Sequence, residues 1–208
     1  MRRFAFTMFE LVIVIVIIGI LAVAAMPSFN TNPLRDAAEQ VAEHIRYTQH
    51  LAMVDDKFDD TNATWWKERW QIRFRTAAGE IQYAVFSNKN QDLNINCNST
   101  LCDEPAKNPL NGLPLFYVPS RPNDGMILSN YGITSVNVSC NTDDNFAYAT
   151  RLGVIAFDNL GRPYRGIYDS TTPTQYLMTQ PCNIVLTGNG GTATITVQPE
   201  TGYVSVIY

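Results

Sequence analysis

The chain has 208 residues, of which 46% are hydrophobic and only 16% are charged, and its formal net charge is −4. This length suits one ordinary domain with an appendage, and the apolar share argues against a disordered chain. The acidic balance disfavours a protein that wraps nucleic acid through its overall charge.

The first feature along the chain is an apolar segment that begins at Phe6. No charged residue occurs over 11–34, and the first half of that stretch is almost purely aliphatic. The segment reaches the roughly 20 residues that cross a bilayer. Arg2 and Arg3 precede it, which puts the N-terminus in the cytoplasm. We therefore expect a transmembrane anchor over 6–27, with a cleaved secretory signal as the alternative.

Glu10 is the one charged residue within this apolar segment. A lone carboxylate in hydrocarbon costs about 3 kcal/mol on insertion scales. Glu10 therefore either lies at the level of the headgroups or awaits a cation from a neighbouring chain. Pro27 lacks a backbone donor and clashes with the preceding turn, so a helix kink or local melting is expected there.

An amphipathic helix is expected next, within 28–60 and ending near 55–60. Apolar or small residues recur at helical spacing after Pro33, and we expect a sheet to cover them: Leu34, Ala38, Val41, Ile45, Thr48 and Ala52. His44 and His50 are six positions apart, which is not the spacing of a helical metal pair. No metal site is expected.

Residues 61–208 predict a β domain with an irregular insertion at about 88–130. Alternating or short apolar runs bounded by turn residues indicate strands. The expected strands are 70–74, 81–86, 136–138, 154–157, 164–168, 184–186, 192–197 and 203–207, with turns at 78–79, 158–161 and 199–202. Long irregular segments such as the insertion are usually functional or mobile.

All four cysteines follow the apolar segment, where an oxidising compartment is available: Cys97, Cys102, Cys140 and Cys182. They allow three pairings. Cys97 with Cys102 would close a short loop, and Cys140 with Cys182 would then join two strand-rich regions. Zinc is disfavoured, because there is no Cys-x2-Cys motif and no nearby histidine.

No catalytic constellation stands out. Both histidines lie on the expected helix, and no Gly-rich phosphate loop precedes a helix. We therefore expect a protein that is not an enzyme and that carries no cofactor.

The residues Phe6-Thr7-Met8-Phe9-Glu10-Leu11, after the short leader 1–5, resemble the start of type IV pilins and pseudopilins. The resemblance implies that a prepilin peptidase cuts between Ala5 and Phe6 and methylates the new amine of Phe6. It implies that Glu10 meets a neighbour's N-terminal amine during filament assembly. Pro27 falls where pilins carry a helix-loosening proline. The family usually has Gly before the cut, so Ala5 predicts slower cleavage.

The later motifs narrow the resemblance. The helix 37–52, the strand at 70–74, the segment 155–163 and the terminal hairpin follow the order seen in the GspH/FimT family of minor pseudopilins. The match covers nearly the whole chain except the insertion. It implies an α+β fold in which a long N-terminal transmembrane and amphipathic helix packs on a small antiparallel β domain.

The function implied by this resemblance is structural. The chain would assemble through its N-terminal helix into a type II secretion pseudopilus or a type IV pilus-like filament, which it would initiate or tip. Its partners would be other pilins or pseudopilins, the prepilin peptidase and the inner-membrane assembly platform. It would cross the bacterial inner membrane once, with its globular domain in the periplasm.

The alternative is a minor pilin that binds DNA for uptake. Some relatives do so through arginines near the C-terminal hairpin, in a Gly-Arg-x-Arg pattern. This chain has no arginine there, and the nearest candidates are Arg162 and Arg165, at a different spacing. Phosphate contacts need clustered cations, so DNA is not the expected partner of this acidic chain.

Overall fold

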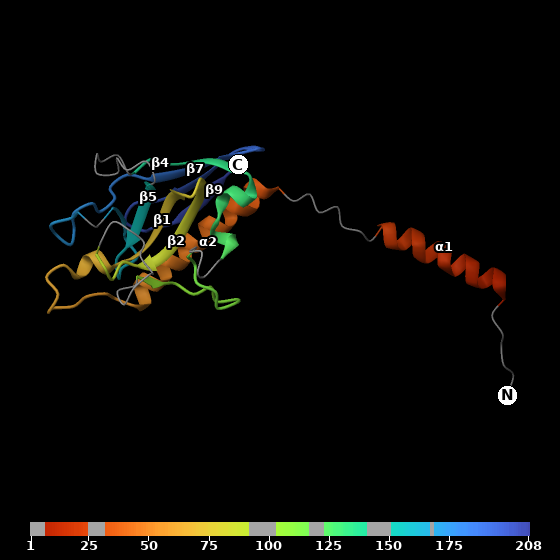
Figure 1. Ribbon diagram of the computed structural model, residues 1–208, viewed down its shortest axis with the longest axis horizontal. Coiled ribbons are helices and arrows are strands. Elements are labelled where there is room, and N and C mark those ends of the chain that lie inside the picture. The colour runs from red at the N-terminus through yellow and green to blue at the C-terminus, as the bar shows by residue number, and fades with distance from the viewer. Residues whose placement is uncertain (1–6, 25–31, 92–102, 117–122, 141–150, 167–168) are drawn as a thin grey trace, which may run out of the picture. The chain divides into compact units, whose positions relative to one another are not determined.

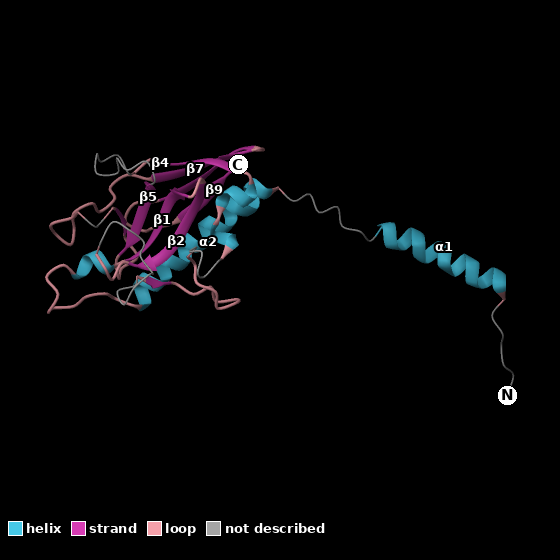
Figure 2. Ribbon diagram, in the orientation of Figure 1, coloured by secondary structure: helices cyan, strands magenta, loops and turns pink. Residues whose placement is uncertain are grey.

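The computed structural model describes residues 7–24, 32–91, 103–116, 123–140, 151–166 and 169–208. The chain divides into two compact units, 1–31 and 32–208, and each is described by itself. The described residues form two α-helices, short 3-10 helices and two antiparallel sheets (Figures 1 and 2). The predicted α+β class with antiparallel strands is confirmed.

The described part of the first unit is a helix, α1 (Met8–Ala24), of 17 residues. Among the described residues, no helix combines the length and the apolar character needed to cross a membrane. Of the expected long helix, the structure describes α1 and α2 (Pro33–Val54), and residues 25–31 lie outside the described residues. The cleavage site at Ala5 and Phe6 and the expected kink at Pro27 lie outside the described residues.

Helix α2 lies within the expected range 28–60, but it begins at Pro33 and ends at Val54, one residue before the expected end near 55–60. The Asn32 side chain accepts a hydrogen bond from the backbone N–H of Arg35, and Pro33 occupies the first turn, where its missing N–H does no harm. Asp55 caps the other end through its backbone N–H. One face is buried, and small residues dominate it: Leu34, Ala37, Ala38, Val41, Ala42, Ile45, Thr48 and Ala52.

The strands form two sheets. The first has the order β3-β2-β1-β5-β6 and the second has the order β4-β7-β8-β9. The first consists of β1 (Trp70–Ala77), β2 (Glu80–Ser87), β3 (Glu104–Pro105), β5 (Arg151–Phe157) and β6 (Pro163–Arg165). The second consists of β4 (Ile133–Val138), β7 (Cys182–Gly188), β8 (Gly191–Val197) and β9 (Val204–Ile207).

Each strand expected from the sequence has a counterpart, although residues 167 and 168 of the expected 164–168 strand lie outside the described residues. The expected insertion at 88–130 contains more structure than its composition suggested. Besides β3, it holds the 3-10 helices η2 (Asp124–Met126) and η3 (Leu128–Tyr131), and a further 3-10 helix, η1 (Trp65–Glu68), precedes β1. Helix η3 packs against both β2 and α2.

The core lies where α2 meets both sheets. The helix contacts β1 and β5 of the first sheet and β8 and β9 of the second, and Figure 1 shows it running along these strands. Ile72 and Phe74 from β1 and Ile195 from β8 are fully buried in this one cluster. Alanines on the helix let the strands approach closely. Because strands cover the apolar face of α2, the predicted covering by a sheet is confirmed.

Gln49 ties α2 to a turn of each sheet. Its side-chain amide donates to the carbonyl of Gly161, at 2.9 Å, and to that of Thr201, at 2.8 Å. The first carbonyl lies in the β5–β6 turn and the second in the β8–β9 turn. Gly202 has φ +63°, and a Cβ there would lie 2.6 Å from the backbone oxygen of Gly161. The two turns therefore approach so closely that only glycine fits.

Replacing Gly202 with alanine is expected to destabilise the chain by about 2 kcal/mol or more, because backbone strain adds to a backbone clash. Gly79 is the matched control: its φ is +82°, but a Cβ there meets nothing within 4 Å. Gly79→Ala should cost only about 1 kcal/mol of left-handed strain. Urea unfolding followed by tryptophan fluorescence measures both; equal losses would contradict a close approach of the two turns.

Candidate functional site

The start of α1 carries the residues that the pilin resemblance singles out. The Thr7 hydroxyl accepts a hydrogen bond from the backbone N–H of Glu10 at 3.3 Å, so Thr7 caps the helix. Glu10 thereby lies in the first turn, where the unsatisfied N–H groups of the backbone favour negative charge. The pattern Thr-x-x-Glu is a helix-start signature in the sequence, and the sequence analysis did not use it.

The Glu10 carboxylate is available to a partner from another chain. It is exposed, and within the described residues it makes no hydrogen bond and no ion pair. The helix around it is exposed and apolar on every side, with the side chains from Met8 to Leu21 solvent-accessible. Such an extended exposed apolar surface requires a membrane or protein partner.

Arg162 is engaged within its own turn. Its guanidinium contacts the Asp158 carboxylate through Nε and Nη2, both at 2.8 Å, and its backbone N–H also donates to that carboxylate. Asp158 is 2% exposed and also accepts hydrogen bonds from the Leu160 N–H and the Tyr164 hydroxyl. The cation of Arg162 therefore neutralises a buried carboxylate and organises the β5–β6 turn.

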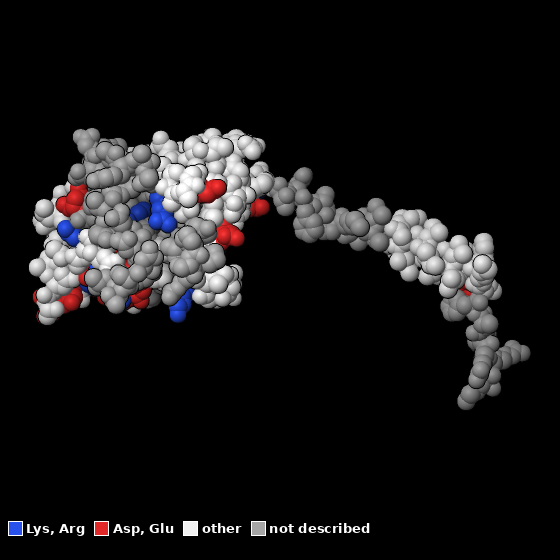
Figure 3. All heavy atoms as spheres, in the orientation of Figure 1, with Lys and Arg blue, Asp and Glu red and all other residues white. Residues whose placement is uncertain are grey.

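Arg165 lies elsewhere on β6, over the Tyr176 ring at 5.5 Å from its centroid. It lines a hollow of about 400 Å³ together with Ser139 and Thr179. The structure thus does not combine Arg162 and Arg165 into a single patch. Figure 3 shows acidic and basic side chains scattered over the visible face of the protein. This arrangement does not favour DNA capture by these two arginines.

The disulfide expected as one of three pairings is present between Cys140 and Cys182, with an S–S distance of 2.01 Å. It joins the end of β4 to the start of β7 across 42 residues of sequence. Such a bond is typical of proteins in an oxidising compartment. Cys97 and Cys102 lie outside the described residues.

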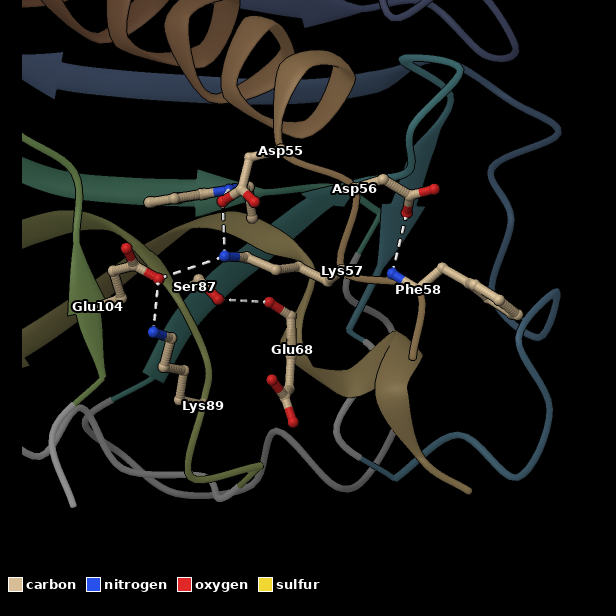
Figure 4. A network of polar contacts seen from close by, with 9 residues as sticks. Asp55, Asp56, Lys57, Phe58, Glu68, Ser87, Lys89 and Glu104 are labelled. Atoms are coloured by element: carbon tan, nitrogen blue, oxygen red, sulfur yellow. Dashed lines mark hydrogen bonds and ion pairs between the residues drawn. The ribbon is translucent and has the colours of Figure 1, made fainter. Parts of the chain in front are cut away.

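A network of charged side chains follows the end of α2 (Figure 4). Lys57 contacts Asp55 and Glu104, and Lys89 also contacts Glu104 at 2.9 Å. The indole N–H of Trp70 donates to Asp55 at 2.9 Å. The network joins the segment after α2 to Trp70 of β1, to Glu104 of β3 and to Lys89, which follows β2.

The network shifts the pKa of each member. Partial burial alone would raise the pKa values of Asp55 and Glu104, but hydrogen bonds and charges from the lysines hold both pKa values below the ordinary range. Burial alone would lower the pKa of Lys57, but the two carboxylates hold it above its ordinary value. The network therefore stabilises the fold at neutral pH.

A groove of about 670 Å³ lies between the exposed side of α2 and the described residues of 108–115 and 123–126. At its base, the Gln40 amide donates to the Tyr83 hydroxyl and to the Gly125 carbonyl, both at 2.6 Å, and accepts from the Tyr131 hydroxyl at 2.9 Å. These bonds fix η2 and η3 against the helix. The groove joins residues that are distant in the sequence, which explains why no sequence pattern indicated it.

His44 lines this groove and is neutral at pH 7. Its Nδ1 lies 2.7 Å from the Tyr83 hydroxyl. Because that hydroxyl accepts a hydrogen bond from the Gln40 amide, its own hydrogen is directed to Nδ1, and the imidazole proton resides on Nε2. Burial lowers the pKa of His44 to about 4.

Among the described residues, no group of three or more His, Cys, Asp or Glu side chains is arranged to hold a metal ion.

Replacing Lys57 with methionine should lower the unfolding free energy at pH 7 by about 1 kcal/mol, because both carboxylates lose a cation. Depressed carboxyl pKa values contribute stability above the unfolded values of 3.8 and 4.5, and this contribution disappears as pH falls through the folded values. The difference in unfolding free energy between the wild type and Lys57→Met should therefore shrink by about 1 kcal/mol between pH 5 and 2. Thermal unfolding across this range checks it, with Lys67→Met as control; an advantage independent of pH would contradict the network's role.

The pH dependence of stability should also report His44. Its folded pKa of about 4 lies below the ordinary value of 6.5, so the unfolded chain takes up the proton first. The contribution of neutral His44 to the unfolding free energy is fully present above pH 6.5. It falls as pH drops, and the loss approaches about 3 kcal/mol near pH 4. Urea unfolding at pH 7.5 and 4.5 should show a smaller loss in His44→Gln. The exposed His50 is the control, and His50→Gln should keep the wild-type loss.

Comparison with known proteins adds no relative: no family model, no curated protein and no solved structure matches this chain.

Proposed function

We propose that the chain is a pilin-like structural subunit that assembles through its N-terminal helix into a type II secretion pseudopilus or a type IV pilus-like filament. The observation that carries the proposal is α1, an exposed apolar helix whose one ionisable side chain, Glu10, lies in its first turn without a partner among the described residues. The prepilin-like sequence around Phe6 supports the same role.

In this proposal the chain is an inner-membrane protein before assembly. The leader 1–5 is removed before Phe6 by the prepilin peptidase, the segment 6–27 anchors the subunit, and the domain 32–208 is periplasmic. The Cys140–Cys182 disulfide supports an oxidising location for that domain. The assembly platform then transfers the subunit into the filament, at its start or tip.

The assembly step depends on charge. The Glu10 carboxylate of one subunit pairs with the methylated amine of Phe6 on a neighbour. This ion pair offsets the cost of a carboxylate among apolar side chains. The aliphatic side chains of α1 then pack against those of neighbouring subunits. DNA capture is not proposed, because Arg162 already neutralises the buried Asp158.

Glu10→Gln should be processed normally but should lose incorporation into sheared filaments by at least tenfold, as should Glu10→Ala. Glutamine keeps the size of the side chain and removes only its charge. The amount of each variant in the sheared filament fraction, relative to the cell-associated processed form, measures incorporation.

Thr7→Ala is the matched control, because it removes the helix cap and keeps the carboxylate. It should retain most of the incorporation. Wild-type incorporation of Glu10→Gln would refute the charge-pairing step. The secreted proteome of a deletion strain then distinguishes the machines: loss of exoproteins indicates a secretion pseudopilus, and an unchanged secretome indicates a type IV pilus.

A further inference from the structure

The groove on the exposed side of α2 has the electrostatic character of a cation site. Of the described residues that line it, Glu39 and Glu43 carry negative charge, one turn apart on the helix, and none is a lysine or arginine. His44 adds no positive charge at pH 7, since burial lowers its pKa to about 4. The described lining therefore carries two negative charges, which attract a cation.

The two carboxylates are not equally engaged. Glu39 accepts a hydrogen bond from the Tyr208 hydroxyl at 2.6 Å. Glu43 is exposed, and within the described parts of the chain it makes no hydrogen bond and no ion pair. Glu43 is therefore the carboxylate available to a ligand.

The remainder of the described lining is mixed and firmly held. Tyr47, Pro109 and Leu110 offer accessible apolar surface beside several asparagines, and Leu110 is 93% exposed at the edge. The Gln40 hydrogen bonds to Tyr83 and Gly125 hold its base in place. A volume of about 670 Å³ is within the range of ligand sites. The groove can thus receive a side chain with an apolar stem and a charged tip without rearranging.

We propose that this groove binds a lysine or arginine side chain on an extended segment of a partner protein, with an apolar residue beside it. The aliphatic stem of the basic residue lies against Tyr47 and Pro109, and its cation pairs with Glu43. The neighbouring apolar residue covers Leu110. A small free amine would leave Leu110 exposed to water, so the ligand chemistry favours a peptide segment. This binding does not depend on the assembly role of α1.

Selection from a random heptapeptide phage library tests the proposal. The full chain is immobilised in detergent micelles, and empty micelles remove peptides that bind detergent. The enriched peptides should contain Lys or Arg next to an apolar residue. Synthetic copies labelled with fluorescein then give dissociation constants by anisotropy at low and high salt.

Glu43→Gln should weaken binding of the selected peptides at least fivefold and should reduce its dependence on salt. Leu110→Ser should weaken binding without changing that dependence. Glu80→Gln, an exposed change at the β1–β2 turn, is the matched control and should bind as the wild type does. Peptides without a basic residue, no enriched peptide at all, or equal binding by Glu43→Gln would each overturn the proposal.

Discussion

The burial of one face of α2 against two sheets is the constraint on which the rest of the second unit depends. No strand belongs to both sheets, and the helix contacts strands of each. Alanine at 37, 38 and 42 lets the strands come close, which only small side chains permit. Gln49 adds a polar link between the helix and both sheets, because its side-chain amide donates to a turn of each sheet. The glycine at 202 is then a consequence of this close approach, because the turns have no room for a Cβ.

Much of this unit could be predicted because its signals are local. Asn32 and Pro33 mark the start of α2, and Ala78 and Gly79 mark a hairpin. The alternation of apolar and polar residues predicts β1, although residues 70–74 are buried on both of its faces. The division into two sheets could not be predicted, since it depends on pairing between distant segments. Strand β1 pairs with β5, about 80 residues later, and β4 pairs with β7. Side-chain period alone does not select such partners.

The candidate sites, too, could be predicted only where their signals are local in the sequence. Glu10 was recognised because its neighbours in sequence form a specific pattern, and Thr7 could have been recognised as its helix cap from the same residues. Arg162 was a candidate for DNA contact, although Asp158, its ion-pair partner, lies only four residues before it. The turn that joins the two residues is irregular, so no helical or strand period indicated the ion pair. The groove beside Glu43 has no sequence signal at all, because packing brings 39–47 together with 108–115 and 123–126.

The position of Glu10 in the first turn of α1 also limits how strongly assembly can depend on it. A carboxylate near a helix N-terminus gains about 0.3–1 kcal/mol from the backbone dipoles, whereas a charge in hydrocarbon costs about 3 kcal/mol on insertion scales. On the proposed mechanism, about 2 kcal/mol is left for a neighbour's amine to offset, which corresponds to a bias of about thirtyfold towards the assembled state. Such a bias is small enough for a single subunit to persist in the membrane.

This bias is also too small to hold a filament together alone, so most of the assembly free energy must come from packing of the exposed aliphatic side chains of α1. Charge at Glu10 would then select the register between neighbouring helices, and the aliphatic surface would supply the cohesion.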